Sequence, residues 1–230
     1  MFLMSISENV TQLRDTIHKL HGNKGIPFPT IVAVTKYSSI SDIQTLIGLG
    51  FNELGESRIQ DAEKKIYALP RNGLIWHLIG HLQSNKVKKA VDLFDWIQSV
   101  DSLALLSRID QECGYIRKQA QILLQVNLSR EPQKFGFLKE EIEAFHTQLF
   151  SFPNVTIRGI MTMGPLSEDK EKIRKCFQEA NTLFLWLRSR YPRHVTVLSM
   201  GMSEDYPLAL EEGATMIRVG HAFYLNSHHG

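Results

Sequence analysis

The sequence predicts a single (β/α)8 barrel, and three observations support this prediction. Strand-like and helix-like segments alternate along the chain, with eight strands and a helix after each of the first seven. Several strand segments are continuous apolar runs, which suit parallel strands covered on both faces. The length of 230 residues fits one barrel, and no linker, repeat or low-complexity segment divides the chain. We therefore take residues 1–230 as one domain. An open, doubly wound sheet is the alternative.

The elements follow in order along the chain. A leading helix is expected near residues 7–21. The predicted strands span residues 31–36, 52–56, 74–80, 95–100, 122–128, 156–163, 195–200 and 216–224. The polar residues that can begin intervening helices are Ser41 with Asp42, Asp101 or Ser102, and Ser167, while Gly50 and Pro192 mark helix ends. Because little chain follows the last strand, we expect a shortened C-terminus without a closing helix.

Composition excludes several classes of partner. Apolar residues make up 43% and charged residues 22%, as in soluble globular proteins, and a net charge of +2 gives no reason to expect nucleic acid or anionic membrane. No apolar run approaches the ~18 to 20 residues of a membrane span. The N-terminus lacks the basic region of a signal peptide. Cys113 and Cys176 have no CxxC spacing, so we expect free thiols in a reducing cytoplasm.

The loops after the seventh and eighth strands predict a phosphate site. In a (β/α)8 barrel the active face lies at the C-terminal ends of the strands, and phosphate commonly binds at these two loops. The seventh strand ends in LSMGMSED, with Ser199, Gly201 and Ser203, and Ser203 can cap the next helix. Gly220 occupies the corresponding place after the eighth strand. Small residues let backbone N–H groups approach an anion, so these loops predict a phosphate cradle.

Two basic residues accompany this cradle. Arg218 lies inside the eighth strand, where burial requires a partner, and Glu56 and Asp205 are the candidates. Lys36 ends the first strand and could simply reach solvent. Beside a phosphate cradle, however, a lysine amine can form a Schiff base with a phosphorylated aldehyde, and pyridoxal phosphate (PLP) is the obvious candidate.

Seven motifs occur in order over residues 31–220. They are VTKYSS, LGES with RIQDAEKK, WHLIGHLQSNK, QVNLSREPQKFG, RGIMTMGP, LSMGMSEDYPLAL and GATMIRVG. Together they resemble the pyridoxal phosphate homeostasis protein family, also called the proline synthetase co-transcribed homologues. WHLIGHLQSNK and LSMGMSED are the most specific of them. The resemblance implies a fold-type III PLP barrel, similar to the N-terminal barrel of alanine racemase.

The resemblance also implies roles for individual residues. Lys36 matches the lysine that forms the Schiff base with PLP, and Arg218 matches the arginine that faces the pyridine nitrogen. The residues implied around the phosphate and the ring are Ser199, Gly201, Met202, Ser203, Gly220 with the amide of His221, Ser57, and His81 at the ligand mouth. The sequence departs from the family pattern where Ser57 replaces asparagine and His221 replaces threonine. Gln133 and Phe135 likewise replace small hydroxylated residues.

His77 and His81 are spaced by four residues, which invites a metal interpretation. They span a strand end and a loop, where this spacing does not place two side chains on one face, and no third ligand is evident. We therefore expect no metal. His77 is expected inside the barrel and His81 near the mouth.

The favoured hypothesis is a PLP-binding protein that buffers or delivers PLP and affects amino-acid and keto-acid balance, without a dedicated catalytic reaction. An amino-acid racemase is the alternative, but it needs a second acid/base group, and Tyr37 should leave the strand on the other side. A Schiff-base aldolase would explain Lys36 and the cradle but not Arg218. The expected partners are PLP and PLP-dependent apo-enzymes, and we expect a cytoplasmic monomer.

Overall fold

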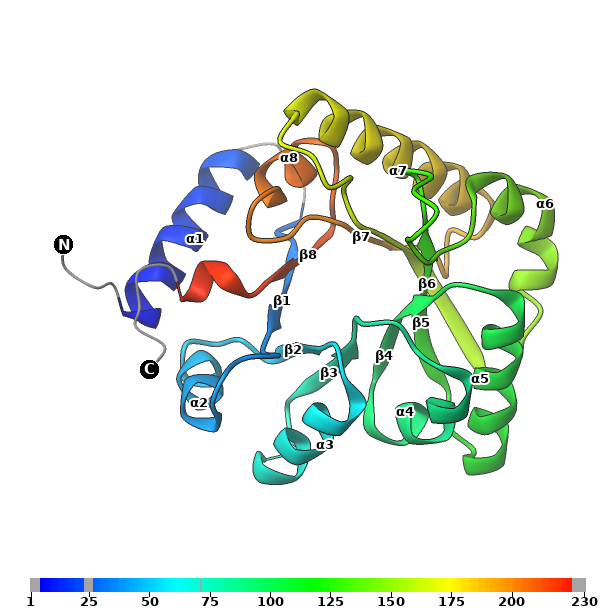
Figure 1. Ribbon diagram of the computed structural model, residues 1–230, viewed down its shortest axis with the longest axis horizontal. Coiled ribbons are helices and arrows are strands. Elements are labelled where there is room, and N and C mark those ends of the chain that lie inside the picture. Colours follow the sequence, from blue (N-terminus) through cyan, green and yellow to red (C-terminus); the bar gives the residue numbers. More distant parts are fainter. Residues whose placement is uncertain (1–4, 23–26, 71, 225–230) are drawn as a thin grey trace.

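The structure is a computed structural model that describes residues 5–22, 27–70 and 72–224. Eight parallel strands close into a barrel in chain order, with β8 paired to β1 (Figure 1). They are β1 (Thr30–Val34), β2 (Glu53–Glu56), β3 (Ile75–Leu78), β4 (Trp96–Val100), β5 (Ala120–Val126), β6 (Val155–Thr162), β7 (Val197–Ser199) and β8 (Met216–Val219). The predicted barrel is therefore confirmed, and the open sheet is excluded.

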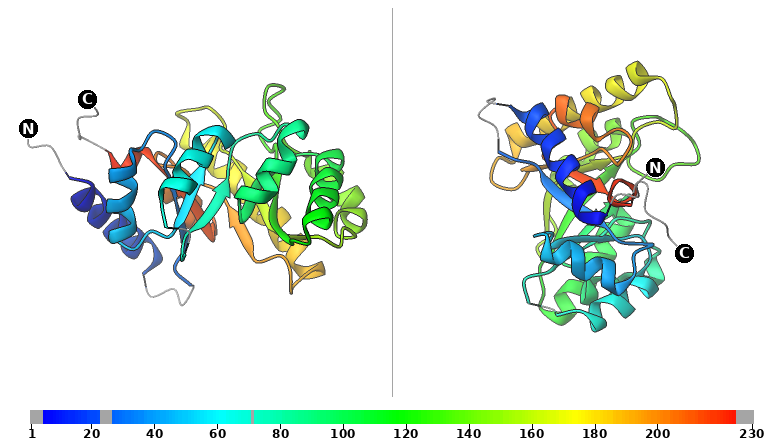
Figure 2. Two further views of the ribbon diagram at one scale, coloured as in Figure 1. Left: turned by 90° about the horizontal axis from the view of Figure 1, so that it is seen from below. Right: turned by 90° about the vertical axis from the view of Figure 1, so that its left-hand side faces the viewer.

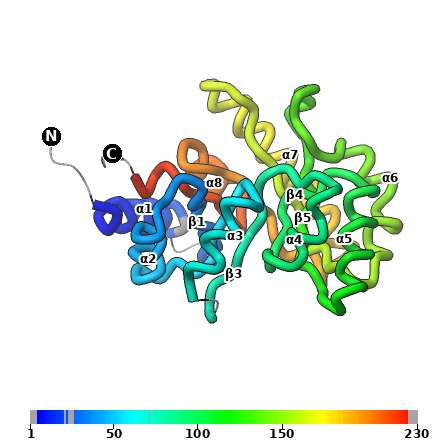
Figure 3. The backbone as a smooth tube through the Cα atoms, turned by 60° about the horizontal axis from the view of Figure 1, so that its bottom comes forward, coloured from blue at the N-terminus to red at the C-terminus, as the bar shows by residue number. Residues whose placement is uncertain are grey.

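The helices form a ring outside the barrel. They are α1 (Ile6–His21), α2 (Ile40–Gly48), α3 (Ile59–Ala68), α4 (Val87–Leu93), α5 (Leu103–Ile116), α6 (Lys139–Leu149), α7 (Lys170–Arg190) and α8 (Tyr206–Glu211). The 3-10 helices η1 (Ser84–Lys86) and η2 (His221–Phe223) follow β3 and β8. Figure 3 shows α1 and α2 at one end of the molecule and α5 and α6 at the other. Over the described ranges, no helix is both long and apolar enough to cross a membrane.

Helix α1 occupies the place in the ring that a helix after β8 would take. It packs against α8, η2 and α2, as Figures 1 and 2 show. Asn9 of α1 donates a buried hydrogen bond to the carbonyl of Phe223, 3.0 Å away. The leading helix thus covers the junction of β8 and β1, beside η2, the last element of the described residues.

The predicted strand 216–224 is wrong beyond Val219. The backbone leaves the extended conformation at Gly220, and the amide of Phe223 donates to the Gly220 carbonyl at 3.0 Å, which forms η2. The other strand bounds are shorter than or shifted from the predicted ranges by a few residues, as is usual where a strand meets a loop.

Capping side chains set the helix starts. Ser39, rather than Ser41 with Asp42, caps α2, because its hydroxyl reaches the Asp42 amide and the Asp42 carboxylate reaches back. Ser102 caps α5, as one of the two predicted candidates. Asp169, rather than Ser167, caps α7. In each case the cap is the residue whose side-chain oxygen can reach an amide in the first turn.

Alternation along the strands separates an apolar outer layer from a polar interior. Leu54, Ile97, Leu124, Leu198 and Ile217 point outward and are buried under the helices. The buried side chains that alternate with them and bond one another inside the barrel are His77, Gln98, Ser199 and Arg218. The barrel therefore positions polar groups on its axis, below the C-terminal face where the site is expected.

Cys113 on α5 and Cys176 on α7 are both buried free thiols. Burial raises the pKa of the Cys176 thiol to about 11. The prediction of free cysteines is confirmed.

Candidate functional site

The loops after β7 and β8 are joined at the C-terminal face of the barrel. The hydroxyl oxygen of Ser203 accepts hydrogen bonds from the amides of Gly220 (3.3 Å) and Ala222 (3.1 Å). The amide of Arg218 donates to the Gly201 carbonyl at 3.0 Å. We expected Ser203 to cap α8, and this is wrong: Asp205 is the N-cap residue. Ser203 instead links the two loops: its oxygen accepts from the amides of Gly220 and Ala222, and its own hydrogen can donate to an anionic oxygen.

Two positions in these loops require glycine. Gly201 has φ +92°, and a Cβ there would lie 2.6 Å from the Cβ of Ala209. A Cβ at Gly220 would lie 3.1 Å from both the Cβ and the carbonyl oxygen of Val34. The predicted small residues therefore allow the loops to approach β1 and α8 closely.

Arg218 lies inside the barrel directly below these loops. Its Nη1 donates to Ser199 Oγ at 2.7 Å and its Nη2 to the Thr162 carbonyl at 2.9 Å. Burial lowers the pKa of Arg218 to about 10, and the Asp205 carboxylate partly counteracts this. The guanidinium is still protonated at neutral pH, so it can only donate hydrogen bonds.

The partners expected for Arg218 were two carboxylates, and its hydrogen-bond partners are uncharged. Glu56 is wrong as a partner, because it points out of the barrel and accepts from Thr35 Oγ1 (2.6 Å) and Lys65 Nζ (2.7 Å). Asp205 acts on Arg218 through its charge alone. Burial raises the pKa of Asp205, and its Oδ1 accepts from the Met202 amide at 2.6 Å.

Lys36 stands at the rim of the same face. The prediction that it ends a strand is wrong, since β1 stops at Val34 and Lys36 lies in a turn. The carbonyl of Thr35 accepts from the Ser38 amide (2.9 Å) and from Lys65 Nζ (2.5 Å), so it does not continue the sheet. The Lys36 side chain is exposed, with Nζ 5.0 Å from the ring centroid of Tyr37. It borders a groove of about 370 Å³ that α3 also lines.

The other predicted residues follow strands at this same face. Ser57 comes directly after β2 and is half-buried. Met202 is exposed in the loop after β7, and His221 is the exposed first residue of η2. The predicted residues thus follow strand ends at one end of the barrel, but the groove at Lys36 is lined by residues 36–40 and α3, and not by Arg218 or the loops after β7 and β8.

His81 lies at the mouth on the side of β3 and β4. Its ring stacks on Phe135, with centroids 3.8 Å apart, and its Nδ1 lies 3.1 Å from Asp101 Oδ2. These three residues line a cavity of about 470 Å³. His77 instead lies inside the barrel with different partners, as predicted. The two histidines therefore do not share a face.

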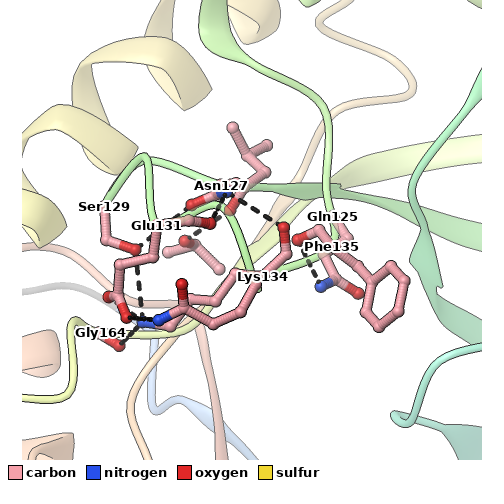
Figure 4. Close-up of polar contacts among 10 residues, drawn as sticks. Gln125, Asn127, Ser129, Glu131, Lys134, Phe135 and Gly164 are labelled. Carbon is pink, nitrogen blue, oxygen red and sulfur yellow. Dashed lines mark hydrogen bonds and ion pairs between the residues drawn. The ribbon is translucent and has the colours of Figure 1, made fainter.

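The loop that presents Phe135 is held by polar contacts within it and with the loop after β6 (Figure 4). Asn127 Nδ2 donates to the carbonyls of Glu131 (2.9 Å) and Lys134 (3.1 Å). Lys134 Nζ donates to Glu131 Oε1 (2.6 Å) and to the Gly164 carbonyl (3.0 Å). The phenylalanine noted as a departure from the family pattern is therefore fixed beside the mouth.

Two polar residues of the interior, the buried Gln98 and the half-buried Glu53, are not among the residues that the sequence pointed to. Gln98 bonds both His77 and Ser199, and Glu53 bonds His77. The sequence did contain a signal for Gln98, because a glutamine in the middle of the strand WIQSV indicates that one face of this strand meets polar groups. Its partners are distant in sequence and could not be read from it.

Comparison of the amino-acid sequence with known proteins identifies the same family as the sequence motifs do. The family model described as "Alanine racemase, N-terminal domain" matches residues 3–228. The chain is 41% identical to the pyridoxal phosphate homeostasis protein of Synechocystis sp. over 195 residues, covering 84% of this chain and 89% of that protein. It is 33% identical to that of Escherichia coli, with 95% of each chain covered.

Solved structures agree. PipY of Synechococcus elongatus, solved without PLP, superposes with a TM-score of 0.87 at 37% identity, covering 96% of this chain and 100% of that one. The same protein with PLP bound gives 0.84. An alanine racemase of Clostridium difficile shares the fold, with a TM-score of 0.71 at 12% identity over 94% of this chain and 56% of that one. The chain belongs to the pyridoxal phosphate homeostasis protein family and has the barrel fold of the alanine racemase N-terminal domain.

Proposed function

We propose that this protein binds PLP as a Schiff base on Lys36 and serves PLP homeostasis by buffering and delivering the cofactor, which affects amino-acid and keto-acid balance. The observation that carries the proposal is the position of the buried Arg218 guanidinium below two glycine-containing loops, on the strand that pairs with β1. Val32 lies opposite Arg218 in the sheet, and Lys36 follows on the same strand end. A phosphorylated aldehyde with a ring nitrogen would use the loops, Arg218 and Lys36 at once.

Each part of the site suits one part of this cofactor. The Ser203 hydroxyl and the glycine-containing loops suit the phosphate, and the amine of Lys36 suits the aldehyde, whose oxygen leaves as water. Arg218 suits the ring nitrogen. We propose that the residues Ser57, His81, Ser199, Gly201, Met202, Ser203, Gly220 and His221 complete the lining.

Arg218 also favours a role without a dedicated reaction. A bound PLP ring withdraws electrons most strongly when its nitrogen is protonated. Arg218 can only donate a hydrogen bond, so it opposes protonation of that nitrogen. The site is therefore better suited to holding PLP than to stabilising a carbanion.

The names of relatives support the same proposal, since they are pyridoxal phosphate homeostasis proteins and PipY was solved with PLP. We propose PLP-dependent apo-enzymes as recipients and a cytoplasmic monomer as the working form. Light scattering of the purified protein at micromolar concentration would give one chain mass for a monomer, and a doubled mass would contradict this part.

Absorption spectra test the binding proposal. Wild-type protein with added PLP should show a Schiff-base band near ~420 nm, and borohydride should fix the cofactor on the peptide that contains Lys36. Lys36→Ala should lose both signals. Lys64→Ala removes an exposed lysine of the same groove and should keep both. A wild-type protein that takes up no PLP would overturn the proposal.

The absence of a dedicated reaction needs a separate measurement. Proton exchange at Cα of several amino acids, followed with saturating PLP in heavy water, should stay below one turnover per site. Multiple turnovers would favour the racemase alternative instead.

A further inference from the structure

A continuous chain of hydrogen bonds crosses the barrel interior from Arg218 to Glu53. Arg218 Nη1 lies 2.7 Å from Ser199 Oγ, which lies 2.8 Å from Gln98 Oε1. Gln98 Nε2 lies 2.9 Å from His77 Nδ1, and His77 Nε2 lies 2.5 Å from Glu53 Oε2. The chain joins a cation near the mouth to a carboxylate at the start of β2.

Chemistry gives this chain a single direction. The guanidinium only donates, so Ser199 Oγ accepts from it and turns its own hydrogen to the Gln98 carbonyl. The Gln98 amide nitrogen then faces His77 Nδ1, which must accept. The remaining ring nitrogen, Nε2, carries the hydrogen and donates to Glu53. His77 is thereby held as the neutral Nε2–H tautomer.

The surroundings oppose any other arrangement. His77, Gln98 and Ser199 are fully buried, and a reversed amide would leave the Ser199 hydroxyl hydrogen without the Gln98 acceptor, at about 1–3 kcal/mol. The Gln98 amide also has Met216 Sδ at 3.3 Å, a weak acceptor that suits an N–H group. The ring of His77 is stacked on Trp96, with centroids 5.5 Å apart.

We propose that Glu53, His77 and Gln98 are positioning residues for Arg218. They orient the Ser199 hydroxyl so that its lone pair faces Nη1, which holds the guanidinium in one place. A guanidinium held in one place would favour PLP over an analogue that lacks the ring nitrogen. This last step rests on the proposed function, whereas the direction of the chain does not.

The direction can be measured without any cofactor. Two-bond ¹⁵N–¹H correlation spectra of the histidines should show His77 as the Nε2–H tautomer at neutral pH, assigned by its loss in His77→Gln. In Gln98→Glu the new carboxylate accepts from both neighbours, so His77 should become an imidazolium with both nitrogens protonated. A wild-type Nδ1–H tautomer, or an unchanged tautomer in Gln98→Glu, would contradict the assigned direction of these hydrogen bonds.

The effect on Arg218 is measured with two ligands, PLP and its 1-deaza analogue, in which a CH group replaces the ring nitrogen. Wild type should prefer PLP, and Gln98→Met should reduce this preference by about threefold to tenfold, the value of one net hydrogen bond. Ile97→Val, a conservative change on the outward face of the same strand, is the control and should keep the preference.

The outcomes are distinguishable. If Gln98→Met weakens both ligands equally, Gln98 is only structural and the positioning proposal fails. If wild type binds neither ligand, the proposed function fails, while the tautomer spectra still decide the direction of the chain.

Discussion

At the scale of single residues, the site depends on a backbone conformation as much as on side chains. Gly201 combines a positive φ with the close approach of α8, so two separate penalties oppose any side chain there. Gly73 shares the first penalty alone, because its φ is +84° and no heavy atom lies within 4 Å of a Cβ built there. Comparing substitutions at Gly201 and Gly73 therefore separates the cost of the backbone conformation from the cost of the steric contact.

Gly201→Ala should lower the free energy of unfolding by about 2–4 kcal/mol, from left-handed strain and overpacking together. Gly73→Ala should cost only about 1–2 kcal/mol. Urea denaturation followed by circular dichroism measures both. Equal costs in the two variants would show that the contact with Ala209 is relieved without penalty.

Burial of Cys176 predicts a dependence of stability on pH. Its pKa rises from an ordinary value near 9.0 to about 11 in the folded state, so folding disfavours the thiolate. The stability linked to this thiol is complete below about pH 9 and is lost as the pH rises toward 11, by about 1–3 kcal/mol. Urea denaturation of wild type and Cys176→Ala at several pH values should show their stability difference shifting in favour of the variant. A constant difference would contradict the burial effect.

At the scale of elements, the start of α2 is defined directly beyond the turn that carries Lys36. Ser39 and Asp42 form a reciprocal capping box, with Ser39 Oγ 3.1 Å from the Asp42 amide and Asp42 Oδ2 3.0 Å from the Ser39 amide. The cap limits the turn to the residues between β1 and Ser39. It therefore helps to hold the Lys36 backbone at the rim.

Ser39→Ala should destabilise the protein by about 1 kcal/mol, the usual cost of a lost N-cap. Ser41→Ala changes an exposed serine inside the same helix and should be neutral or slightly stabilising, because alanine is the better helix former. Thermal denaturation of the two variants compares them directly. A cost at Ser41 equal to that at Ser39 would contradict the assigned cap.

At the scale of the whole molecule, α1 completes the helix ring next to the candidate site. It contacts α8 and η2, which follow the two loops of the proposed phosphate site. The N-terminal helix therefore supports a face whose chemistry comes from residues about 200 positions later. The hydrogen bond from Asn9 to Phe223 is one polar link between α1 and η2.

Asn9→Ala should cost about 1–3 kcal/mol, because it leaves a buried carbonyl of η2 without this donor. It should also weaken PLP binding, since η2 contains one of the amides that converge on Ser203. Gln12→Ala, on the exposed face of α1, should change neither property. Urea denaturation and PLP titration measure the two effects, and a destabilised Asn9→Ala with wild-type PLP affinity would show that α1 supports the fold alone.

Much of the fold could be predicted because its signals are local. Strand-like segments, several of them apolar runs, identify all eight strands, and residues that cap or stop helices locate α2, α5 and α7 to within a few positions. The rule that barrel sites lie at the C-terminal ends of strands placed Ser199, Gly201, Ser203 and Gly220 at one face without any structure. Errors occurred where a long-range contact decided the local outcome, as at Thr35, whose carbonyl bonds Lys65.

By itself, the sequence determined the barrel, its order of strands and the motifs that assign the family, because each depends on residues close together in the chain. The tertiary structure alone decided the partners of Arg218 and the role of Ser203. It also decided the chain from Ser199 through Gln98 and His77 to Glu53. Those bonds join strands that are far apart in sequence, and only closure of the barrel brings their inward side chains within hydrogen-bonding distance.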